Sequence, residues 1–468
     1  LGDKPDAGDG RYIHFLALGE PGQVTINSPC LEDGARWMVY LRAAHHVILQ
    51  GFNLEGAATP GDRGAKGPWA GIMLDGDFGR TGALAHHIVI VGNFSHNHVN
   101  WGLHSTDTRS VLLQDNVFAL SAREHSAYVS DGSDDYVIRR NIFFGSHQSG
   151  LQCNLDPEAS LREVMKHEAL QGAPRFAPSR AWAEHVLDLA TARFGEHGFP
   201  DGRGVGFIIE DNVINQNGRG GGGALNLAGL AGSLIQNNLI YGNLNHGIAE
   251  WDNMNPFDAA SVASPPATAE QASSTALLPR WGCHDNLIRN NTVLLANPRR
   301  AAVLLVNGSY RNRLRNNVLI NDADASMDID GSSLLGLDAG YSATNTVRYR
   351  SAPFDQPSVA PFPDGVRAVA VSLLEVNHTI TGVTQQRIAA ELMDSSDEPW
   401  ILVNGASWRL NPKRPDFRPR PGSALLAGRA DPSELPPLDL SGRARRTADI
   451  GAFGAAEGSP DAKPSPGN

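Results

Sequence analysis

The chain has 468 residues, 41% of them hydrophobic, with 50 glycines and a formal net charge of −11. A chain of this length and apolar content can bury a large core. The acidic balance and the lack of a basic run argue against nucleic acid and against an anionic membrane surface as partners. No stretch is long and apolar enough to predict a membrane span.

The chain begins at Leu1 rather than Met, which indicates a processed or trimmed N-terminus with no signal peptide left to read. Its three cysteines, Cys30, Cys153 and Cys283, allow at most one disulfide and lack the close spacing of a metal site. Cysteine content therefore leaves both the disulfide status and the redox compartment open.

Residues 1–22 are polar and Gly-rich and predict an irregular lead-in. Regular laps are expected from about Val24, with strands at 37–41 and 45–49. Residues 86–90 repeat the second of these strands, including its pair of leading histidines. We interpret these paired histidines as turn residues, with metal ligation as the alternative. The Gly- and Pro-rich segment 57–70 predicts an exposed loop.

A short motif recurs through residues 86–333: an aliphatic run, an Asn, a second aliphatic pair and a polar turn. Where no insertion intervenes, the Asn returns after 23 to 26 residues. A period of this length fits one lap of a parallel β-solenoid, with three short strands and three turns per lap. The recurring residues are Asn93, Asn116, Asn141, Asn212, Asn238, Asn291 and Asn317.

An Asn at the same turn of successive laps predicts a ladder of side-chain amides. Asn tolerates a left-handed backbone, and its amide can bond the same residue one lap away. One lap cannot bury its apolar side alone, so the laps must stack around a continuous core. The sequence therefore predicts an all-β fold, a parallel β-helix over residues 23–349. A β-sandwich with Asn-rich turns scattered by chance is the alternative.

Two long segments interrupt the repeat. Residues 157–203 predict two helices, at about 159–171 and 180–196, with Ser179 as a candidate N-cap of the second. Residues 254–282 are rich in Pro, Ala and Ser and predict a long loop. Both segments follow the same strand of the lap, so we expect them to rise from one edge of the solenoid and to flank a groove.

After about residue 349 the repeat is lost. Residues 350–454 predict a C-terminal cap or closing coils, with one helix at 385–393. Residues 455–468 are of low complexity and predict a disordered tail.

Polar residues fall in two outward columns when the laps are aligned on a Gly or Ala followed by an aliphatic residue, because strand side chains alternate between faces. This alignment puts Val129 beside His104 and leaves Tyr128 in an inward position. Amides beside an indole ring suit a sugar, which offers hydroxyl groups and a flat C–H face. The alternative is that these residues merely solvate an outer sheet. The expected substrate-binding residues are Arg123, His147, Gln152, Asn154, Asn226 and Trp251.

Candidate acids and bases fall in the same laps. An imidazole can shuttle protons near neutral pH, and paired carboxylates serve hydrolysis. His125, Tyr128 and Arg123 could together remove a proton next to a uronate carboxylate. The histidines could instead be turn residues that bond the backbone, and Glu250 could point inward, where burial would raise its pKa. The candidate catalytic residues are His104, His125, Tyr128, Asp131, Asp156, Glu250 and Asp252.

Asp131, Asp134 and Asp135 lie in one acidic turn and could bind Ca²⁺ through carboxylate oxygens. An acidic turn without a metal is the alternative, and the sequence suggests no other cofactor. It contains no nucleophile elbow, phosphate loop or zinc motif.

The repeat resembles the right-handed parallel β-helix proteins of the pectate-lyase-like superfamily, and among them the secreted bacterial type. Segments 125–130, 247–253 and 301–307 and the closing motif 448–453 carry the resemblance, which covers about residues 23–345. It implies an extracellular or periplasmic location and glycan processing, because lyases, glycoside hydrolases and epimerases share this scaffold. No motif selects one subfamily, and the aspartate triplet expected of a polygalacturonase is not evident.

We therefore expect a secreted enzyme that cleaves glycosidic bonds of a polysaccharide bound along the groove. Elimination would use His125 or His104 as the base, whereas hydrolysis would use two of the candidate carboxylates. The acidic balance favours hydrolysis, and the cluster of His and Tyr favours elimination. The alternative of another class is a non-catalytic glycan-binding or cell-surface protein in which the solenoid is a rigid spacer. The sequence leaves the oligomeric state open.

Overall fold

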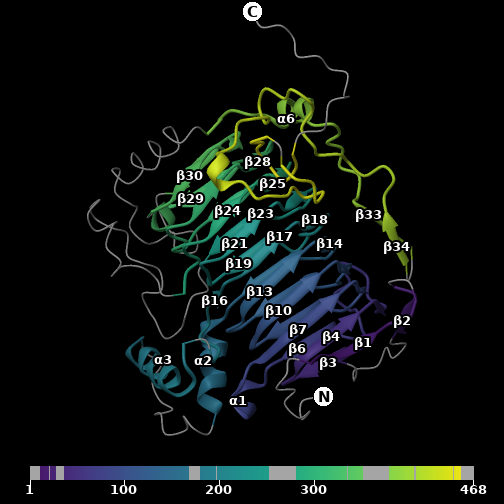
Figure 1. Ribbon diagram of the computed structural model, residues 1–468, viewed down its shortest axis with the longest axis vertical. Helices are drawn as coiled ribbons and strands as arrows, with labels where there is room; N and C mark the ends of the chain where they lie inside the picture. The colour runs from purple at the N-terminus through teal and green to yellow at the C-terminus, as the bar shows by residue number, and fades with distance from the viewer. Residues whose placement is uncertain are drawn as a thin grey trace, which may run out of the picture.

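Three parallel sheets of ten strands each run along the molecule, and each lap of the chain adds one strand to every sheet (Figure 1). This architecture is the parallel β-helix that the repeat predicted. We name the sheets A, B and C in the order in which a lap visits them. The computed structural model describes residues 11–19, 22–27, 36–167, 180–196, 198–251, 281–334, 336–350, 379–404, 407–445 and 447–454.

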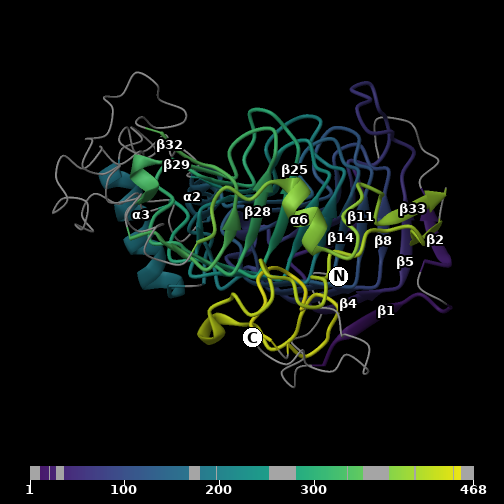
Figure 2. The same cartoon turned by 90° about the horizontal axis from the view of Figure 1, so that it is seen from above.

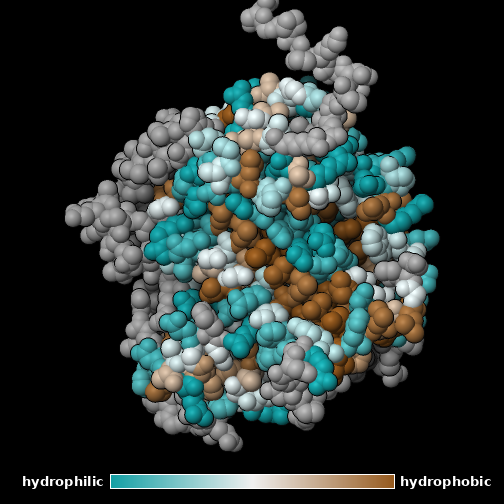
Figure 3. Space-filling model, in the orientation of Figure 1, coloured by the Kyte–Doolittle hydropathy of each residue, from teal (hydrophilic) through white to brown (hydrophobic). Residues whose placement is uncertain are grey.

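Sheet A carries a row of apolar side chains on its outer face. From the second strand to the eighth, register aligns half-buried aliphatic residues that begin with Ile48 and end with Leu287. Hydrophobic residues gather at the centre of this face in Figure 3. The strands are β1 (Ile13–Leu16), β4 (His45–Gln50), β7 (Ala85–Val91), β10 (Thr108–Gln114), β13 (Asp134–Arg139), β17 (Ile208–Glu210), β21 (Leu234–Gln236), β24 (Leu287–Arg289), β27 (Arg313–Arg315) and β30 (Asp338–Gly340).

The first lap begins earlier than predicted. β1 pairs in parallel with β4, with Ile13 opposite Val47, so residues 1–22 are not only an irregular lead-in. The strand is short and mostly exposed because it lies at the end of the stack and has one neighbouring lap instead of two. It also lacks the Asn that marked the later laps.

The outer face of sheet B is covered by the C-terminal part of the chain (Figure 2). Tyr241 of sheet B packs against Phe417, and Ile450 joins the same buried cluster. Ile380 forms one parallel bridge with Ala343 at the end of the sheet. The described part of the expected cap at 350–454 is therefore mainly a cover along the side of the β-helix. Sheet B consists of β2 (Val24–Asn27), β5 (Phe52–Glu55), β8 (Phe94–His96), β11 (Val117–Ala119), β14 (Ile142–Phe144), β18 (Val213–Asn215), β22 (Leu239–Tyr241), β25 (Thr292–Leu295), β28 (Val318–Asn321) and β31 (Ala343–Thr344).

The described residues of the C-terminal part form little regular structure. The predicted helix at 385–393 is present as α6 (Gln385–Glu391), and the side chain of Thr384 caps it by accepting the N–H of Arg387. β33 (Ile401–Asn404) and β34 (Ser407–Leu410) form an antiparallel pair. The short 3₁₀ helix η4 (Pro432–Glu434) also belongs to this part, whereas η3 (Gly331–Leu334) lies between β29 and β30 of the β-helix. The expected tail at 455–468 lies outside the described residues.

Sheet C carries both long insertions, as predicted, since the first follows β15 and the second follows β23. The second, expected at 254–282, lies outside the described residues except for 281–282. Sheet C consists of β3 (Trp37–Arg42), β6 (Ala70–Asp75), β9 (Trp101–Thr106), β12 (Ala127–Ser130), β15 (Leu151–Asn154), β19 (Gly223–Ala228), β23 (His246–Trp251), β26 (Val303–Leu305), β29 (Met327–Asp330) and β32 (Val347–Arg350).

The first insertion forms two helices close to the predicted ranges, α2 (Pro157–Lys166) and α3 (Arg180–Phe194). They pack with the unpredicted α1 (Phe78–Thr81) around Phe78, Leu161 and Leu187, at the lower left of Figure 1. Ser179, the candidate cap of α3, lies outside the described residues. The short strands β16 (Gly204–Val205) and β20 (Leu230–Ala231) pair where the chain returns to the β-helix.

The recurring asparagines form the predicted ladder. Asn93 Nδ2 donates to Asn116 Oδ1 at 3.1 Å, Asn116 Nδ2 donates to Asn141 Oδ1 at 3.0 Å, and the chain of bonds continues to Asn317. The left-handed backbone belongs to the preceding residue instead, for example Asp115 with φ 55°. That residue makes the corner, so the Asn side chain can point along the stack.

Candidate active site

The outer row of sheet C brings His104, Tyr128, Gln152 and Asn226 side by side in successive laps. Three of them were expected there. The expectation for the fourth was wrong: Tyr128 lies beside His104, and Val129 points into the core.

The wrong position expected for Tyr128 comes from one small residue, Ser126. Register places Ala127 opposite Leu103, so Ser126 occupies the position that Gly102 holds one lap earlier. An alignment that puts Ala127 at that position shifts this lap by one residue. A shift of one residue exchanges the inner and outer faces of a strand.

Three aromatic rings form a half-buried surface on this row. The rings of His104 and Tyr128 stack with centroids 4.9 Å apart and planes 12° from parallel. Trp101 lies against His104 at 4.4 Å. Burial lowers the pKa of His104 to about 4 and raises that of the Tyr128 phenol, so both groups are neutral at physiological pH. A neutral aromatic surface of this kind suits the C–H face of a sugar ring.

The expected amide residues contact one another. Trp251 Nε1 donates to Asn226 Oδ1 at 3.0 Å, and Asn226 Nδ2 donates to Gln152 Oε1 at 2.6 Å. Asn154 Nδ2 reaches the Tyr128 hydroxyl at 3.4 Å. Gln152 and Asn226 are buried, so these amides first support the row and offer few free groups to a ligand.

Asp131 lies just beyond the carboxyl end of β12, at the rim of the same face. Its Oδ2 accepts a 2.5 Å hydrogen bond from Thr106 Oγ1 and a 3.3 Å bond from Ser130 Oγ. Ser130 Oγ also lies 3.2 Å from His104 Nε2, which links the carboxylate to the aromatic surface. Burial raises the pKa of Asp131 to about 6, although both hydroxyl donors oppose the shift.

Asp107 occupies the same position one lap earlier. Register pairs Thr106 with Ser130, and the residues that follow them, Asp107 and Asp131, both have a left-handed backbone with φ 52°. Asp107 is buried, and its Oδ1 accepts no hydrogen bond from the described residues. Burial, and then the charge of Asp131, raise its pKa well above the ordinary range. Sequence reasoning missed Asp107, although a hydroxyl residue followed by Asp recurs one lap apart.

A cavity of about 1050 Å³ lies between these strand ends and helices α1 and α2. Its cations are already paired, because Arg42 and Arg80 both contact Asp77 and Lys166 contacts Glu163. The charged lining consists of Arg42, Asp75, Asp77, Arg80, Asp107, Asp131, Arg162, Glu163, Lys166 and His167.

His125 has a structural partner in the backbone. Its Nδ1 accepts the N–H of Ser149 at 3.1 Å, and burial lowers its pKa to about 3. Arg123 donates from Nη2 to the carbonyl of Ala65 at 2.9 Å and so holds the loop at 57–70. His147 is half-buried, and burial is the first cause that lowers its pKa. These three residues therefore lie around the site without joining the Asp107–Asp131 pair.

The other candidate carboxylates are placed elsewhere. Asp156 caps α2 by accepting the N–H of Glu158 at 2.9 Å. Glu250 points into the core, is fully buried and accepts a 3.0 Å bond from Asn286 Nδ2, so it cannot reach a substrate. Burial raises the pKa of Glu250 to about 8. Asp252 lies outside the described residues.

The expected calcium turn does not bring its carboxylates together. Asp134 turns inward, where its Oδ1 accepts the N–H of Val205 at 2.8 Å and burial raises its pKa to about 8. Asp135 is an exposed left-handed residue on β13, and Asp131 faces the cavity. Across the described part of the chain, three possible ligand atoms converge within 4.8 Å only on β4 and β7 of sheet A.

Cys153 and Cys283 are buried, and Cys30 lies outside the described residues. No helix in the described ranges is long and apolar enough to span a membrane.

No family model matches the sequence, and a search of curated proteins finds no match. Among solved structures, the chain is similar to a pectate lyase, with 12% identity and a TM-score of 0.43 over 95% of this chain and 83% of that one. The A-module of mannuronan C-5 epimerase from Azotobacter vinelandii has 13% identity and a TM-score of 0.34 over 72% of this chain and 83% of the module. The Dettilon tailspike protein has 9% identity and a TM-score of 0.36. The match covers 73% of this chain and 60% of the length of the tailspike chain.

Proposed function

We propose that the protein hydrolyses glycosidic bonds of a polysaccharide in the cavity beside the carboxyl ends of the sheet C strands. One observation carries the proposal: Asp107 and Asp131 line this cavity from equivalent positions in successive laps, in environments that both disfavour the charged form. Two neighbouring carboxyl groups that cannot both ionise easily are suited to divide acid and nucleophile roles between them.

The surroundings of the two groups assign the roles. Asp107 is the more deeply buried of the two and has an oxygen that no described residue donates to, so it holds the proton and acts as general acid. Asp131 accepts hydrogen bonds from Thr106 and Ser130, which stabilise its carboxylate. Asp107 protonates the glycosidic oxygen while Asp131 bonds to the anomeric carbon, and the leaving sugar departs. Water then breaks the ester and returns its proton to Asp107.

The spacing of laps supports a retaining outcome. Neighbouring strands lie about 4.8 Å apart, which is closer to the roughly 5–5.5 Å between carboxyl groups of retaining glycosidases than to the roughly 6.5–9.5 Å of inverting ones. The aromatic surface of Trp101, His104 and Tyr128 adjoins the pair through Ser130. A sugar ring on that surface would bring its glycosidic bond toward the two aspartates.

Elimination fits the same cavity less well. It needs a base and a cation that neutralises the uronate carboxylate, yet Arg42 and Arg80 are both occupied by Asp77. Imidazoles with a pKa of about 4 for His104 and about 3 for His125 are weak bases.

The test is a digest of neutral and acidic polysaccharides by wild type, Asp107→Asn and Asp131→Asn. Asp115→Asn is the matched control, because Asp115 has the same left-handed backbone but lies outside the cavity. We expect wild type and control to release reducing ends without unsaturated uronate, and both site variants to lose about a hundredfold or more in kcat. Unsaturated products, inactivity on every glycan, or site variants as active as wild type would overturn the proposal. Inactivity with retained glycan binding would instead indicate a binding protein.

A further inference from the structure

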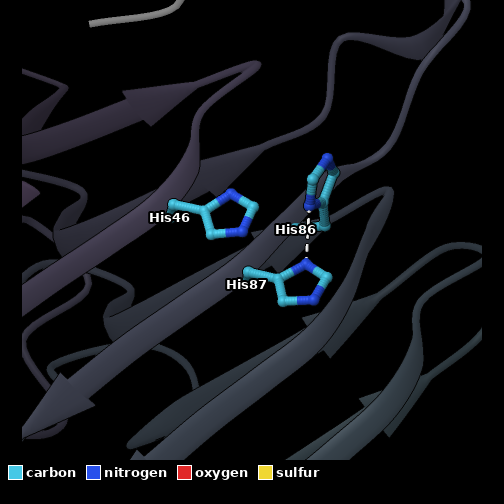
Figure 4. A group of neighbouring side chains, drawn as sticks. All are labelled: His46, His86 and His87. Atoms are coloured by element: carbon cyan, nitrogen blue, oxygen red, sulfur yellow. Dashed lines mark hydrogen bonds between the residues drawn. The ribbon is translucent and has the colours of Figure 1, made fainter. Parts of the chain in front are cut away.

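Histidines gather where two neighbouring laps enter sheet A, and none of them lines the cavity. His45 and His46 begin β4, His86 and His87 lie near the start of β7, and register pairs His45 with His86. His46, His86 and His87 each place a ring nitrogen within 4.8 Å of the other two (Figure 4). The proposed hydrolysis uses none of them.

The three rings face one another from two laps. The rings of His46 and His87 are parallel, with centroids 4.7 Å apart and planes differing by 6°. The ring of His86 crosses that of His87 at 81°, and their Nδ1 atoms are 2.7 Å apart (Figure 4). At this distance the two nitrogens share one proton, and a metal ion could replace it. Tetrahedral zinc with Zn–N bonds of about 2.0–2.1 Å needs nitrogens roughly 3.3 Å apart, so a small opening of the pair is enough.

The backbone explains why adjacent histidines share one side of the sheet. Successive side chains of a regular strand point to opposite faces. His46 and His87 have left-handed backbones with φ 53° and 54°, which interrupt the alternation at the same place in both laps. The next laps have this bend at Ser110 and Asp135, so the bend belongs to the fold. Among the described laps, only these two have a histidine as the left-handed residue of the bend.

The cluster is open to solvent. His46 and His86 are half-buried and His87 is exposed, so an ion and its water can enter. Arg109 on β10 pairs in register with His86, and its positive charge opposes a cation here. Removing the charge of Arg109 should therefore strengthen metal binding, whereas removing a histidine ligand should weaken it.

We propose that His46, His86 and His87 bind one divalent transition-metal ion, with water completing the coordination. Three imidazole nitrogens without a thiolate suit zinc, nickel or copper, whereas calcium and magnesium take oxygen ligands. Because His46 comes from β4 and the other two from β7, the bound ion would join two laps of the β-helix.

The test is calorimetric titration of the protein with zinc chloride after removal of any affinity tag, together with the visible spectrum after cobalt(II) addition. His46→Asn and His87→Asn each remove one ligand and keep a residue that tolerates the left-handed backbone. His14→Asn, an exposed histidine on β1, is the control. Circular dichroism and the melting temperature without metal establish that every variant is folded.

We expect one zinc ion per wild-type chain and a higher melting temperature with zinc. His46→Asn and His87→Asn should weaken binding at least tenfold and abolish the tetrahedral cobalt spectrum, while His14→Asn should bind as wild type does. Arg109→Gln should strengthen binding a few-fold. The proposal is overturned if wild type binds no zinc or if neither ligand variant changes the affinity. It is also overturned if His14→Asn weakens binding as much as they do. These readouts do not depend on glycan hydrolysis.

Discussion

Thr106 Oγ1 donates a 2.5 Å hydrogen bond to Asp131 Oδ2 across two laps of sheet C. This bond stabilises the carboxylate and opposes the rise that burial causes in its pKa, which is about 6. Thr106→Val removes the donor, so the pKa of Asp131 should rise further. We expect the acidic limb of the pH profile of kcat/KM to move upward by about half a unit to one unit.

Ser130→Ala is the matched comparison, because the Ser130 bond to Asp131 is longer, at 3.3 Å. In Ser130→Ala the acidic limb of the kcat/KM profile should also move upward, but by less than in Thr106→Val. An acidic limb that stays in place in Thr106→Val would show that Asp131 does not set it.

Glu250 should make the protein less stable as the pH rises. Its carboxyl group loses its proton near pH 4.5 in the unfolded chain but only at about 8 in the core. Between these values the folded state holds one more proton, so the free energy of unfolding falls with rising pH, by about 1.4 kcal/mol per unit at most. Glu250→Gln should remove this slope and exceed wild type in stability at pH 9. Urea unfolding at pH 5, 7 and 9 measures the effect, and equal slopes in both proteins would contradict it.

Asn238 is an inner rung of the ladder. Its Oδ1 accepts the backbone N–H and the side-chain amide of Asn212, and its own amide donates to Asn291 Oδ1 at 3.0 Å. Asn238→Ala should cost about 2–4 kcal/mol, because each buried group left unpaired costs roughly 1–3 kcal/mol. The exposed Asn404→Ala should stay within about 0.5 kcal/mol of wild type. Thermal unfolding compares them, and similar losses in the two variants would count against the ladder as a stabilising element.

His104 acts in this account as a surface for the sugar and not as a base. His104→Phe keeps the ring and removes both nitrogens, so kcat should remain within about tenfold of wild type. His104→Ala should raise KM because the ring stacked on Tyr128 is lost. Steady-state kinetics separate the two readings, since a catalytic imidazole would make both variants equally inactive.

The features that could be predicted from the sequence are those that repeat. The Asn at each turn predicted the ladder from Asn93 to Asn317 and the lap length, because one local interaction recurs in every lap. The shared edge of the two insertions followed from the strand that both of them follow. The outer row of His104, Gln152 and Asn226 followed from the alternation of strand side chains.

The features that were missed depend on single departures from the repeat. Ser126 stands where neighbouring laps have Gly, and this hid the outward position of Tyr128 and the equivalence of Asp107 with Asp131. The sequence leaves an inward position of Glu250 as the alternative to a catalytic one, and its burial beside Asn286, a residue far along the chain, decides for the inward position. Burial decides the pKa values at the site, and burial depends on helices whose packing one lap cannot reveal.

Hydrolysis by Asp107 and Asp131 is tested most directly by digesting the best substrate of the glycan panel in oxygen-18-labelled water. Hydrolysis places one labelled oxygen at each new reducing end, whereas elimination places none, and mass spectrometry of the fragments distinguishes them. We predict one label per cleavage, with the anomeric configuration retained by proton NMR. Unlabelled fragments that carry an unsaturated uronate would contradict the account.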